Sequence, residues 1–224
     1  MAVQIEILKN VPYFAGLDTS ELNSIARLMF EKKVDRGEMV LLEGESADKL
    51  YFIASGVVKI FKTSAEGKEQ ILDIIRPGQS FNDVSIFDGG PALASAQAMG
   101  PVVIYGIRKS NLESILRATP RLVFNIIKVL AGRVRHLASL VEDLSFKRVI
   151  GRVAKILLEH AGDGTSGPRP RLTQQEMAAM AGSAREVIGR SLKALEEDGV
   201  IRLDRQRIVI TNKEALKEIM ESPA

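Results

Sequence analysis

Apolar residues recur with a regular spacing between Pro120 and Leu144, just past the middle of the chain. They follow one another at intervals of four and three residues, at Val123, Ile127, Leu130, Val134, Leu137, Val141 and Leu144. A period of 3.5 residues keeps one apolar seam on one side of a helix, as in helices that pair with each other. Phe124, Ile126 and Leu140 widen the stripe, so one flank is expected to pack on its own domain. We therefore predict a dimerisation helix over residues 120–144, with a core helix of a monomer as the alternative.

Short apolar runs separated by glycines dominate the chain before this helix. The glycines are Gly37, Gly44, Gly56, Gly67 and Gly78. The runs predict strands at Met39–Leu42, Leu50–Ala54, Val57–Lys62, Gln70–Ile74 and Val102–Ile107. Short strands at such spacings, with Gly-containing turns between them, favour an antiparallel β-roll or jelly roll. Two helices are predicted beside the strands, at Thr19–Phe30 with Asp18 as its cap and at Lys109–Ala118.

After the long helix, the pattern predicts further helices and then a hairpin. Ser145–Ala161 is amphipathic. The capping boxes Thr173-x-x-Glu176 and Ser183-x-x-Glu186 mark two helix starts, with Gly182 between them, and so predict a helix–turn–helix. Gly199 ends the second helix. A basic β-hairpin, or wing, is predicted from Val200–Leu203 and Arg207–Ile210, with Asp204, Arg205 and Gln206 between them.

The second helix of this pair presents one polar and one apolar face. Arg185, Glu186, Gly189, Arg190 and Lys193 share one arc, and Val187, Ile188, Leu192 and Leu195 share the opposite one. In a DNA major groove, arginine donates two hydrogen bonds to guanine and glutamate accepts one from cytosine. We therefore predict that Arg185, Glu186 and Arg190 read bases. The alternative is an ordinary solvated face with ion pairs along the helix. Contacts to phosphate are expected from Thr173, Gln174, Ser183, Lys193 and Arg207.

Composition and charge restrict the chemistry open to this chain. It has no cysteine and two histidines, His136 and His160, which excludes disulfides, thiolate metal sites, cysteine nucleophiles and an iron–sulfur cluster ligated by cysteine. The net charge of +3 comes from residues 145–224, with 14 basic against 11 acidic side chains, since residues 1–144 balance at 17 each. No apolar run is long enough to span a membrane, and Met1 to Lys9 lacks the features of a signal peptide, so we expect a cytoplasmic protein.

These residues resemble the cyclic-AMP receptor protein/fumarate–nitrate regulator (CRP/FNR) family of bacterial transcription regulators over nearly the whole chain. The matching motifs of the β-roll, in order, are Arg36-Gly37-Glu38, Glu43-Gly44-Glu45, Leu50-Tyr51-Phe52-Ile53, Gly56-x-Val58 and Glu66-Gly67-Lys68-Glu69. Gly151-Arg152-Val153-Ala154 is similar to the start of the helix that follows the dimer helix. Arg185-Glu186-x-x-Gly189-Arg190 resembles the recognition helix of the cyclic-AMP receptor branch, which implies half-sites similar to TGTGA. The resemblance also implies RNA polymerase as a partner.

The resemblance fails at the effector pocket. Cyclic-nucleotide binders of the family carry Phe-Gly-Glu and, about ten residues later, an arginine that neutralises the cyclic phosphate. This chain has Phe81-Asn82-Asp83-Val84, and Leu93-Ala94 stand where the arginine is expected. Leu137-Ala138 align with the Thr-Ser pair of the dimer helix that reads adenine. Burial of a phosphate without a cation is costly. A cyclic nucleotide is therefore not the expected effector.

Three possibilities remain for the effector. It is an apolar or aromatic molecule, a haem that binds a gas, or absent, so that control comes from expression level. The tentative pocket consists of Phe81, Asn82, Asp83, Val84, Leu93, Ala94, Leu137 and Ala138. A haem would need an axial ligand, and His136 is the candidate for it, although a histidine there is more often a solvated residue of the helix flank.

Together these patterns predict an α+β protein with three parts. They are an N-terminal antiparallel β-roll at residues 1–119 that senses an effector, a dimerisation helix at 120–144, and a C-terminal winged helix–turn–helix at 145–224. The expected function is that of a homodimeric transcription regulator that binds an inverted repeat in double-stranded DNA, and not that of an enzyme. Alternatives are a regulator that responds to a cyclic nucleotide through an atypical pocket, and a small-molecule binding module without DNA function.

Overall fold

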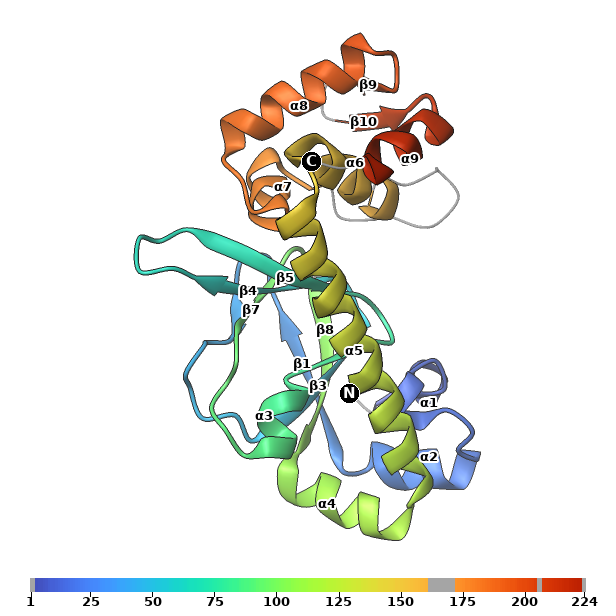
Figure 1. The fold of residues 1–224 in the computed structure, drawn as a ribbon. Coiled ribbons are helices and arrows are strands. Elements are labelled where there is room, and N and C mark those ends of the chain that lie inside the picture. The colour runs from blue at the N-terminus through green and yellow to red at the C-terminus, as the bar shows by residue number, and fades with distance from the viewer. Residues whose placement is uncertain (1–2, 161–171, 205–206, 223–224) are drawn as a thin grey trace. The chain divides into compact units, whose positions relative to one another are not determined.

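The computed structural model describes residues 3–160, 172–204 and 207–222 (Figure 1). These residues belong to two compact units. The first unit contains residues 1–62 and 72–136, and the second contains residues 63–71 and 137–224. Ala161, the last residue of the predicted helix Ser145–Ala161, and Arg205 and Gln206 of the predicted wing lie outside the described residues.

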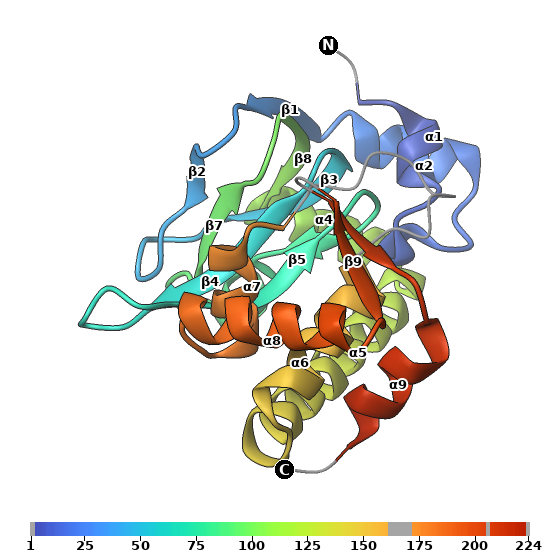
Figure 2. The ribbon, with the colours of Figure 1, turned by 90° about the horizontal axis from the view of Figure 1, so that it is seen from above.

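Two four-stranded antiparallel sheets form the β-roll, as the glycine-punctuated pattern predicts. One sheet has the strand order β1-β8-β3-β6 and the other has the order β2-β7-β4-β5, whose strands run side by side in Figure 2. The strands are β1 (Met29–Val34), β2 (Met39–Leu41), β3 (Lys49–Ser55), β4 (Val58–Thr63), β5 (Glu69–Ile75), β6 (Ser80–Phe81), β7 (Ser95–Ala98) and β8 (Val102–Arg108). The sequence pattern did not predict β1, β6 and β7.

Both faces of β3 are buried, because successive side chains of a strand point to opposite sides. Tyr51 and Ile53 face a core that they share with Val58, Ala96 and Phe81 of the β-roll. Leu50 and Phe52 face a second core, formed with the helices of the same unit. Tyr13 and Phe14 both contact the ring of Phe52 there, with ring centroids 5.5 and 5.2 Å apart. The continuous apolar run Leu50–Ala54 reflects this burial on two sides.

Four helical segments cover the outer core of this unit. They are α1 (Ile5–Leu8), the 3-10 turn η1 (Pro12–Phe14), α2 (Thr19–Ala26) and α4 (Lys109–Ala118). The predicted cap of α2 is confirmed, since Asp18 accepts a hydrogen bond from the Glu21 backbone and Glu21 accepts one from the Asp18 backbone, each of 2.8 Å.

The prediction that α2 extends to Phe30 is wrong, because the chain enters β1 at Met29. Phe30 pairs with Gly106 of β8 across the sheet. A β-carbon at Gly106 would lie 2.2 Å from the Phe30 ring, so only glycine fits opposite this aromatic side chain. Pairing with β8 therefore outweighs the helical periodicity of these residues.

The long helix α5 (Arg121–Phe146) is confirmed and extends two residues beyond the predicted end. Leu122 and Ile126 are buried against the first unit, and Leu130 is partly buried there. Phe124 is 70% exposed, so the expectation that it packs on its own domain is wrong. The remaining seam positions are all exposed by more than a third, at Val123, Ile127, Val134, Leu137, Val141 and Leu144. Apart from Leu130, the heptad seam is therefore exposed among the residues that the structure describes.

The second unit contains the predicted helices and hairpin, together with a C-terminal helix α9 that the sequence pattern did not predict, around a core of its own. They are α6 (Val149–His160), α7 (Gln174–Ala181), α8 (Arg185–Glu197), β9 (Ile201–Asp204), β10 (Arg207–Ile210) and α9 (Lys213–Glu221). Val153, Ile156 and Leu157 of α6 pack with Ile188 and Leu192 of α8. Among the described residues, no helix is long and apolar enough to cross a membrane.

Candidate nucleic-acid interface and effector pocket

Helix α7 and helix α8 form the helix–turn–helix. Thr173 caps α7 with the predicted capping box: its hydroxyl accepts a hydrogen bond of 3.1 Å from the Glu176 backbone, and Glu176 accepts one of 2.7 Å from the Thr173 backbone. Gly182 ends α7 in the left-handed conformation, with φ of 62°. Glycine adopts this conformation without the steric cost that a β-carbon brings. The tight turn places the start of α8 three residues later.

The capping box predicted at Ser183 is not formed. Helix α8 begins at Arg185 with Ala184 at its N-cap, and no side chain caps it. The Ser183 backbone instead donates a hydrogen bond of 3.0 Å to the Ala178 carbonyl and so completes the C-terminal cap of α7. Ser183 therefore belongs to the end of the first helix rather than to the start of the second.

Helix α8 presents the polar face that its sequence predicts. The side chains of Ile188, Leu192 and Leu195 are buried in the core of the second unit. Arg185, Glu186, Arg190 and Lys193 are exposed on the other side. Lys193 forms an exposed ion pair with Glu197, at 3.5 Å. Exposed pairs of this kind contribute little to stability, so Lys193 can exchange its partner for a phosphate at low cost.

The other predicted phosphate contacts lie beside this helix or on the hairpin. Thr173 and Gln174 are exposed at the start of α7, and Gln174 is the side chain next to Gly189: a β-carbon at Gly189 would lie 3.9 Å from its amide oxygen. Arg207 is exposed on β10, opposite Asp204. Glu196 of α8 accepts a hydrogen bond of 2.7 Å from the Leu203 backbone and thereby ties the hairpin to the recognition helix.

Residues 81–84 stand where cyclic-nucleotide binders carry Phe-Gly-Glu, and we call them the degenerate cassette. They lead into a short helix, α3 (Asp83–Asp88), that the sequence pattern did not predict. Asn82 precedes it in the left-handed conformation, with φ of 68°, where the family motif has glycine. Asparagine tolerates this conformation better than most residues. Its side chain donates a hydrogen bond of 2.7 Å to the Lys49 carbonyl. The backbone of the cassette is thus retained although its glycine is not. Phe81 is buried and stacks on Tyr51.

Asp83 is buried, and its carboxylate already has two partners. Arg133 of α5 forms an ion pair with one oxygen, and the Tyr13 hydroxyl donates a hydrogen bond to the other. Arg133 also donates to the carbonyl of Ser80. Burial lowers the pKa of Arg133, and it raises the pKa of Tyr13 to about 12 against the opposing charge of Arg133. Tyr13, Ser80 and Arg133 could not be predicted as neighbours of Asp83, because no local sequence pattern connects them with it.

The other residues of the tentative pocket are dispersed. Val84 is 42% exposed and Leu93 is 53% exposed, whereas Ala94 is buried. Leu137 and Ala138 are exposed on the part of α5 that belongs to the second unit. Leu93, which stands where the phosphate-binding arginine is expected, therefore lies at the surface of the chain.

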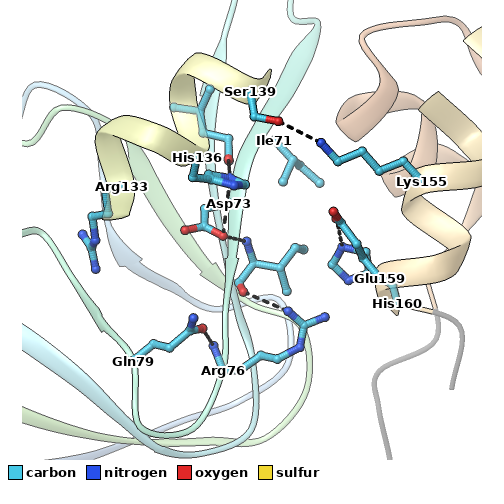
Figure 3. A network of polar contacts seen from close by, with 12 residues as sticks. Ile71, Asp73, Arg76, Gln79, Arg133, His136, Ser139, Lys155, Glu159 and His160 are labelled. Atoms are coloured by element: carbon cyan, nitrogen blue, oxygen red, sulfur yellow. Dashed lines mark hydrogen bonds and ion pairs between the residues drawn. The ribbon is translucent and has the colours of Figure 1, made fainter. Parts of the chain in front are cut away.

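A cavity of about 300 Å³ in the first unit is lined by residues other than these. Its lining consists of Pro12, Tyr13, Asp73, Ile75, Gln79, Ser80, Val129, Gly132, Arg133 and His136. His136 is half exposed and points toward Asp73, with 4.0 Å between its Nε2 atom and the carboxylate (Figure 3). The same Nε2 atom lies 3.2 Å from the Leu72 carbonyl, which can only accept, so it carries the proton of this hydrogen bond. Among the described residues, no group of three His, Asp or Glu side chains could hold a metal ion.

Each of the two units contains a region that matches a known protein family. Residues 31–119 match the cyclic nucleotide-binding domain family, and residues 151–219 match the Crp-like helix-turn-helix domain family. A CRP-like cAMP-activated global transcriptional regulator of Mycobacterium tuberculosis is 34% identical over 217 residues, which cover 94% of this chain and 97% of that protein. The chain belongs to the CRP/FNR family of transcription regulators.

Further relatives support the same assignment. The cyclic AMP receptor protein of Thermus thermophilus is 32% identical over 213 residues, covering 95% of this chain and 98% of that protein. The crystal structure of a CRP/FNR family transcriptional regulator from the same organism shares the fold, with a TM-score of 0.74 at 24% identity, over 87% of this chain and 100% of that one. The chain is therefore a DNA-binding transcription regulator and not an enzyme, as its sequence predicts.

Proposed function

We propose that this regulator binds a two-fold symmetric DNA site as a homodimer. The exposed polar face of α8 carries the proposal. Arg185, Glu186 and Arg190 supply donors and an acceptor for base edges, on a helix whose opposite face is buried in its own core. Thr173, Gln174, Ser183, Lys193 and Arg207 are proposed to contact phosphates, which position the protein without specifying sequence. The resemblance of these residues to the cyclic-AMP receptor branch implies half-sites similar to TGTGA, with the arginines on guanines and Glu186 on a cytosine.

The exposed seam of α5 supports the dimer. Val134 and Val141 are 66% and 64% exposed, and they alternate with Ile127 and Leu137 along one line of the helix. An apolar stripe with heptad spacing is buried when two such helices pair. Two recognition helices related by a two-fold axis fit adjacent major grooves, about 34 Å apart. We expect RNA polymerase as a further partner and the cytoplasm as the location, since the DNA of bacterial cells lies there.

We infer that the effector is not a cyclic nucleotide, although one relative is named as cAMP-activated and the other as a cyclic AMP receptor protein. The cassette carboxylate of Asp83 is occupied by Arg133 and Tyr13, and the phosphate-binding arginine is replaced by the exposed Leu93. An apolar or aromatic molecule, or no effector, fits these residues better. The cavity beside Val129 and Ile75 is the proposed place for such a molecule, because its charged groups already have protein partners.

The hydrogen bond of His136 disfavours a haem that is held through Nε2. An axial ligand binds iron through the lone pair of a ring nitrogen. The Nε2 atom of His136 lies 3.2 Å from the Leu72 carbonyl, so ligation of an iron through Nε2 would break this hydrogen bond and only Nδ1 is left for a metal.

A mobility-shift titration tests the proposed function. Purified protein without added effector should bind an inverted repeat of TGTGA-like half-sites at least about 1,000-fold more tightly than unrelated DNA of equal length. Equal affinity for both DNAs at physiological salt would contradict the proposal. It would favour the alternative of a small-molecule binding module whose DNA domain has lost its function.

A further inference from the structure

Arg152, in the first turn of α6, joins the C-terminal ends of two other helices. Its Nε atom donates a hydrogen bond of 2.8 Å to the carbonyl of Ala181, the last residue of α7. Its Nη1 atom donates one of 2.5 Å to the carbonyl of Lys147 and one of 3.4 Å to that of Asp143, at the end of α5. One guanidinium group therefore caps the dimerisation helix and the first helix of the helix–turn–helix together.

This arrangement suits arginine for two physical reasons. The last carbonyls of a helix have no partner within the helix and carry a partial negative charge. A guanidinium group is a planar fork of donors with a permanent positive charge, so it can serve two helix ends at once, whereas the ammonium group of lysine is a compact point charge. Burial lowers the pKa of Arg152, and the carboxylate of Asp143 counteracts this effect.

Additional contacts make the same junction rigid. Asp143 is only 6% exposed and binds Lys147, at 2.8 Å, and Lys155 of α6. Lys155 also donates a hydrogen bond of 3.1 Å to Ser139, as Figure 3 shows. The turn after α7 contacts α5 directly, because a β-carbon at Gly182 would lie 2.8 Å from a methyl group of Leu144. The last turns of α5 are thus fixed to both α6 and the end of α7.

We propose that Arg152 is a positioning residue, which sets the orientation of the recognition helix relative to the dimerisation helix and thereby the spacing of half-sites that the dimer accepts. The hydrogen bonds of Arg152 go to the ends of α5 and α7, and its own helix packs against the buried side of α8. Its contribution is therefore to the placement of α8, not to the reading of bases. The inference depends on the proposed function, because only a dimer on a symmetric site has a spacing to select.

The test measures affinity for operators whose half-sites are identical but whose spacer is shortened or lengthened by one base pair. Three single variants are compared with the unsubstituted protein: Arg152→Gln, Arg152→Lys, and Arg148→Gln as a matched control. Arg148 is an exposed arginine four residues earlier, and only its backbone carbonyl, which the control preserves, bonds to Arg152. Dimer mass and thermal unfolding are recorded for each variant. Affinity for a single half-site reports whether base reading is intact.

We expect Arg152→Gln and Arg152→Lys to keep their preference for the half-site sequence and to lose about tenfold of the discrimination between spacers. The lysine variant retains the positive charge but not the planar fork of donors. A loss of spacer discrimination in this variant therefore shows that the geometry of the guanidinium group is responsible, and this comparison holds even if the glutamine variant does not fold. Arg148→Gln should behave like the unsubstituted protein. Unchanged spacer discrimination, or an equal loss of affinity at every spacer, would overturn the positioning role. An unsubstituted protein that shows no spacer preference would contradict the proposed dimeric function instead.

Discussion

Asp83 and Arg133 form a buried ion pair between the degenerate cassette and helix α5. The Asp83 side chain is fully buried and that of Arg133 is 26% exposed. The carboxylate of the cassette is therefore neutralised by an arginine of the protein itself and not by a ligand. It also fixes α5 to the β-roll, since Arg133 binds Ser80 of β6 as well.

Removal of one member of this pair should destabilise the first unit. Arg133→Met leaves the Asp83 carboxylate buried without its cation, so we expect a loss of about 3–5 kcal/mol in the free energy of unfolding, measured by urea titration. The double variant with Asp83→Asn should recover part of this loss, because no uncompensated charge remains. Lys128→Met, at an exposed position of the same helix, is the control. Equal losses in the single and double variants would show that the pair is not coupled.

A charge in the heptad seam should separate the dimer. Val134→Glu is the best probe because Val134 is 66% exposed, whereas Leu130 also packs on the core of its own unit. Two facing carboxylates in a desolvated interface cost on the order of several kcal/mol. Sedimentation should show monomers at micromolar concentration with an unchanged circular dichroism spectrum. Lys128→Glu, on another face, should remain dimeric, and a stable Val134→Glu dimer would mean that the seam is not the interface.

The contribution of Asp143 to stability should depend on pH. Burial acts to raise the pKa of this carboxyl group, but hydrogen bonds and charges from Lys147 and Lys155 outweigh burial and hold the pKa below its usual value. A lowered pKa in the folded state contributes stability above the unfolded value of about 3.9, and this contribution is lost as the pH falls through the folded-state value. Asp143→Asn should thus destabilise the protein at neutral pH, by a margin that shrinks below about pH 4. If the difference in stability between the two proteins does not change with pH, the charge of Asp143 is not the source of its contribution.

Cyclic nucleotides should not bind at the cassette. Calorimetry with cyclic AMP and cyclic GMP should show no saturable heat, because Asp83 is paired within the protein and no arginine stands at position 93. A dissociation constant near 1 μM, equivalent to about −8 kcal/mol, would show that the cassette accepts a nucleotide through other groups.

The sequence predicts the folds of both units well because their signals are local. Gly182, the capping box at Thr173 and the heptad spacing of α5 each act within a few residues of the chain. The short strands β6 and β7 escape prediction, since Ser80–Phe81 has two residues and Ser95–Ala98 consists of small or polar ones. The prediction that Ser183 caps α8 is wrong, although Ser183-x-x-Glu186 has the pattern of a capping box. The turn after Gly182 shifts the N-cap of α8 by one residue, to Ala184.

The candidate pocket could not be predicted in the same way. The partners of Asp83 come from η1 and α5, which lie far from it in sequence. Motif alignment indicates which position has lost its arginine, but it gives no information on which other cation is near. Arg152 illustrates the same limit, because its acceptors are backbone carbonyls that no residue pattern reveals.

Two alanine variants on α8 should separate base reading from phosphate binding. Glu186→Ala should relax discrimination at one base pair in each half-site, by about 1–3 kcal/mol. Lys193→Ala should weaken binding to all sequences about equally and reduce the dependence of affinity on salt, since it removes a phosphate contact. Titrations against single-base operator variants at several salt concentrations distinguish the two effects. An equal loss of affinity for all operator variants in Glu186→Ala would show that Glu186 does not read a base.

The central claim, that a dimer reads a symmetric site through α8, is tested most directly by selection from a random DNA pool. The unsubstituted protein and its Glu186→Ala variant are each used to select and sequence bound DNA. We predict an inverted repeat with half-sites in adjacent major grooves for the first, and the same repeat with one relaxed base pair in each half-site for the second. Recovered sites without symmetry, or an identical set of sites for both proteins, would contradict the account.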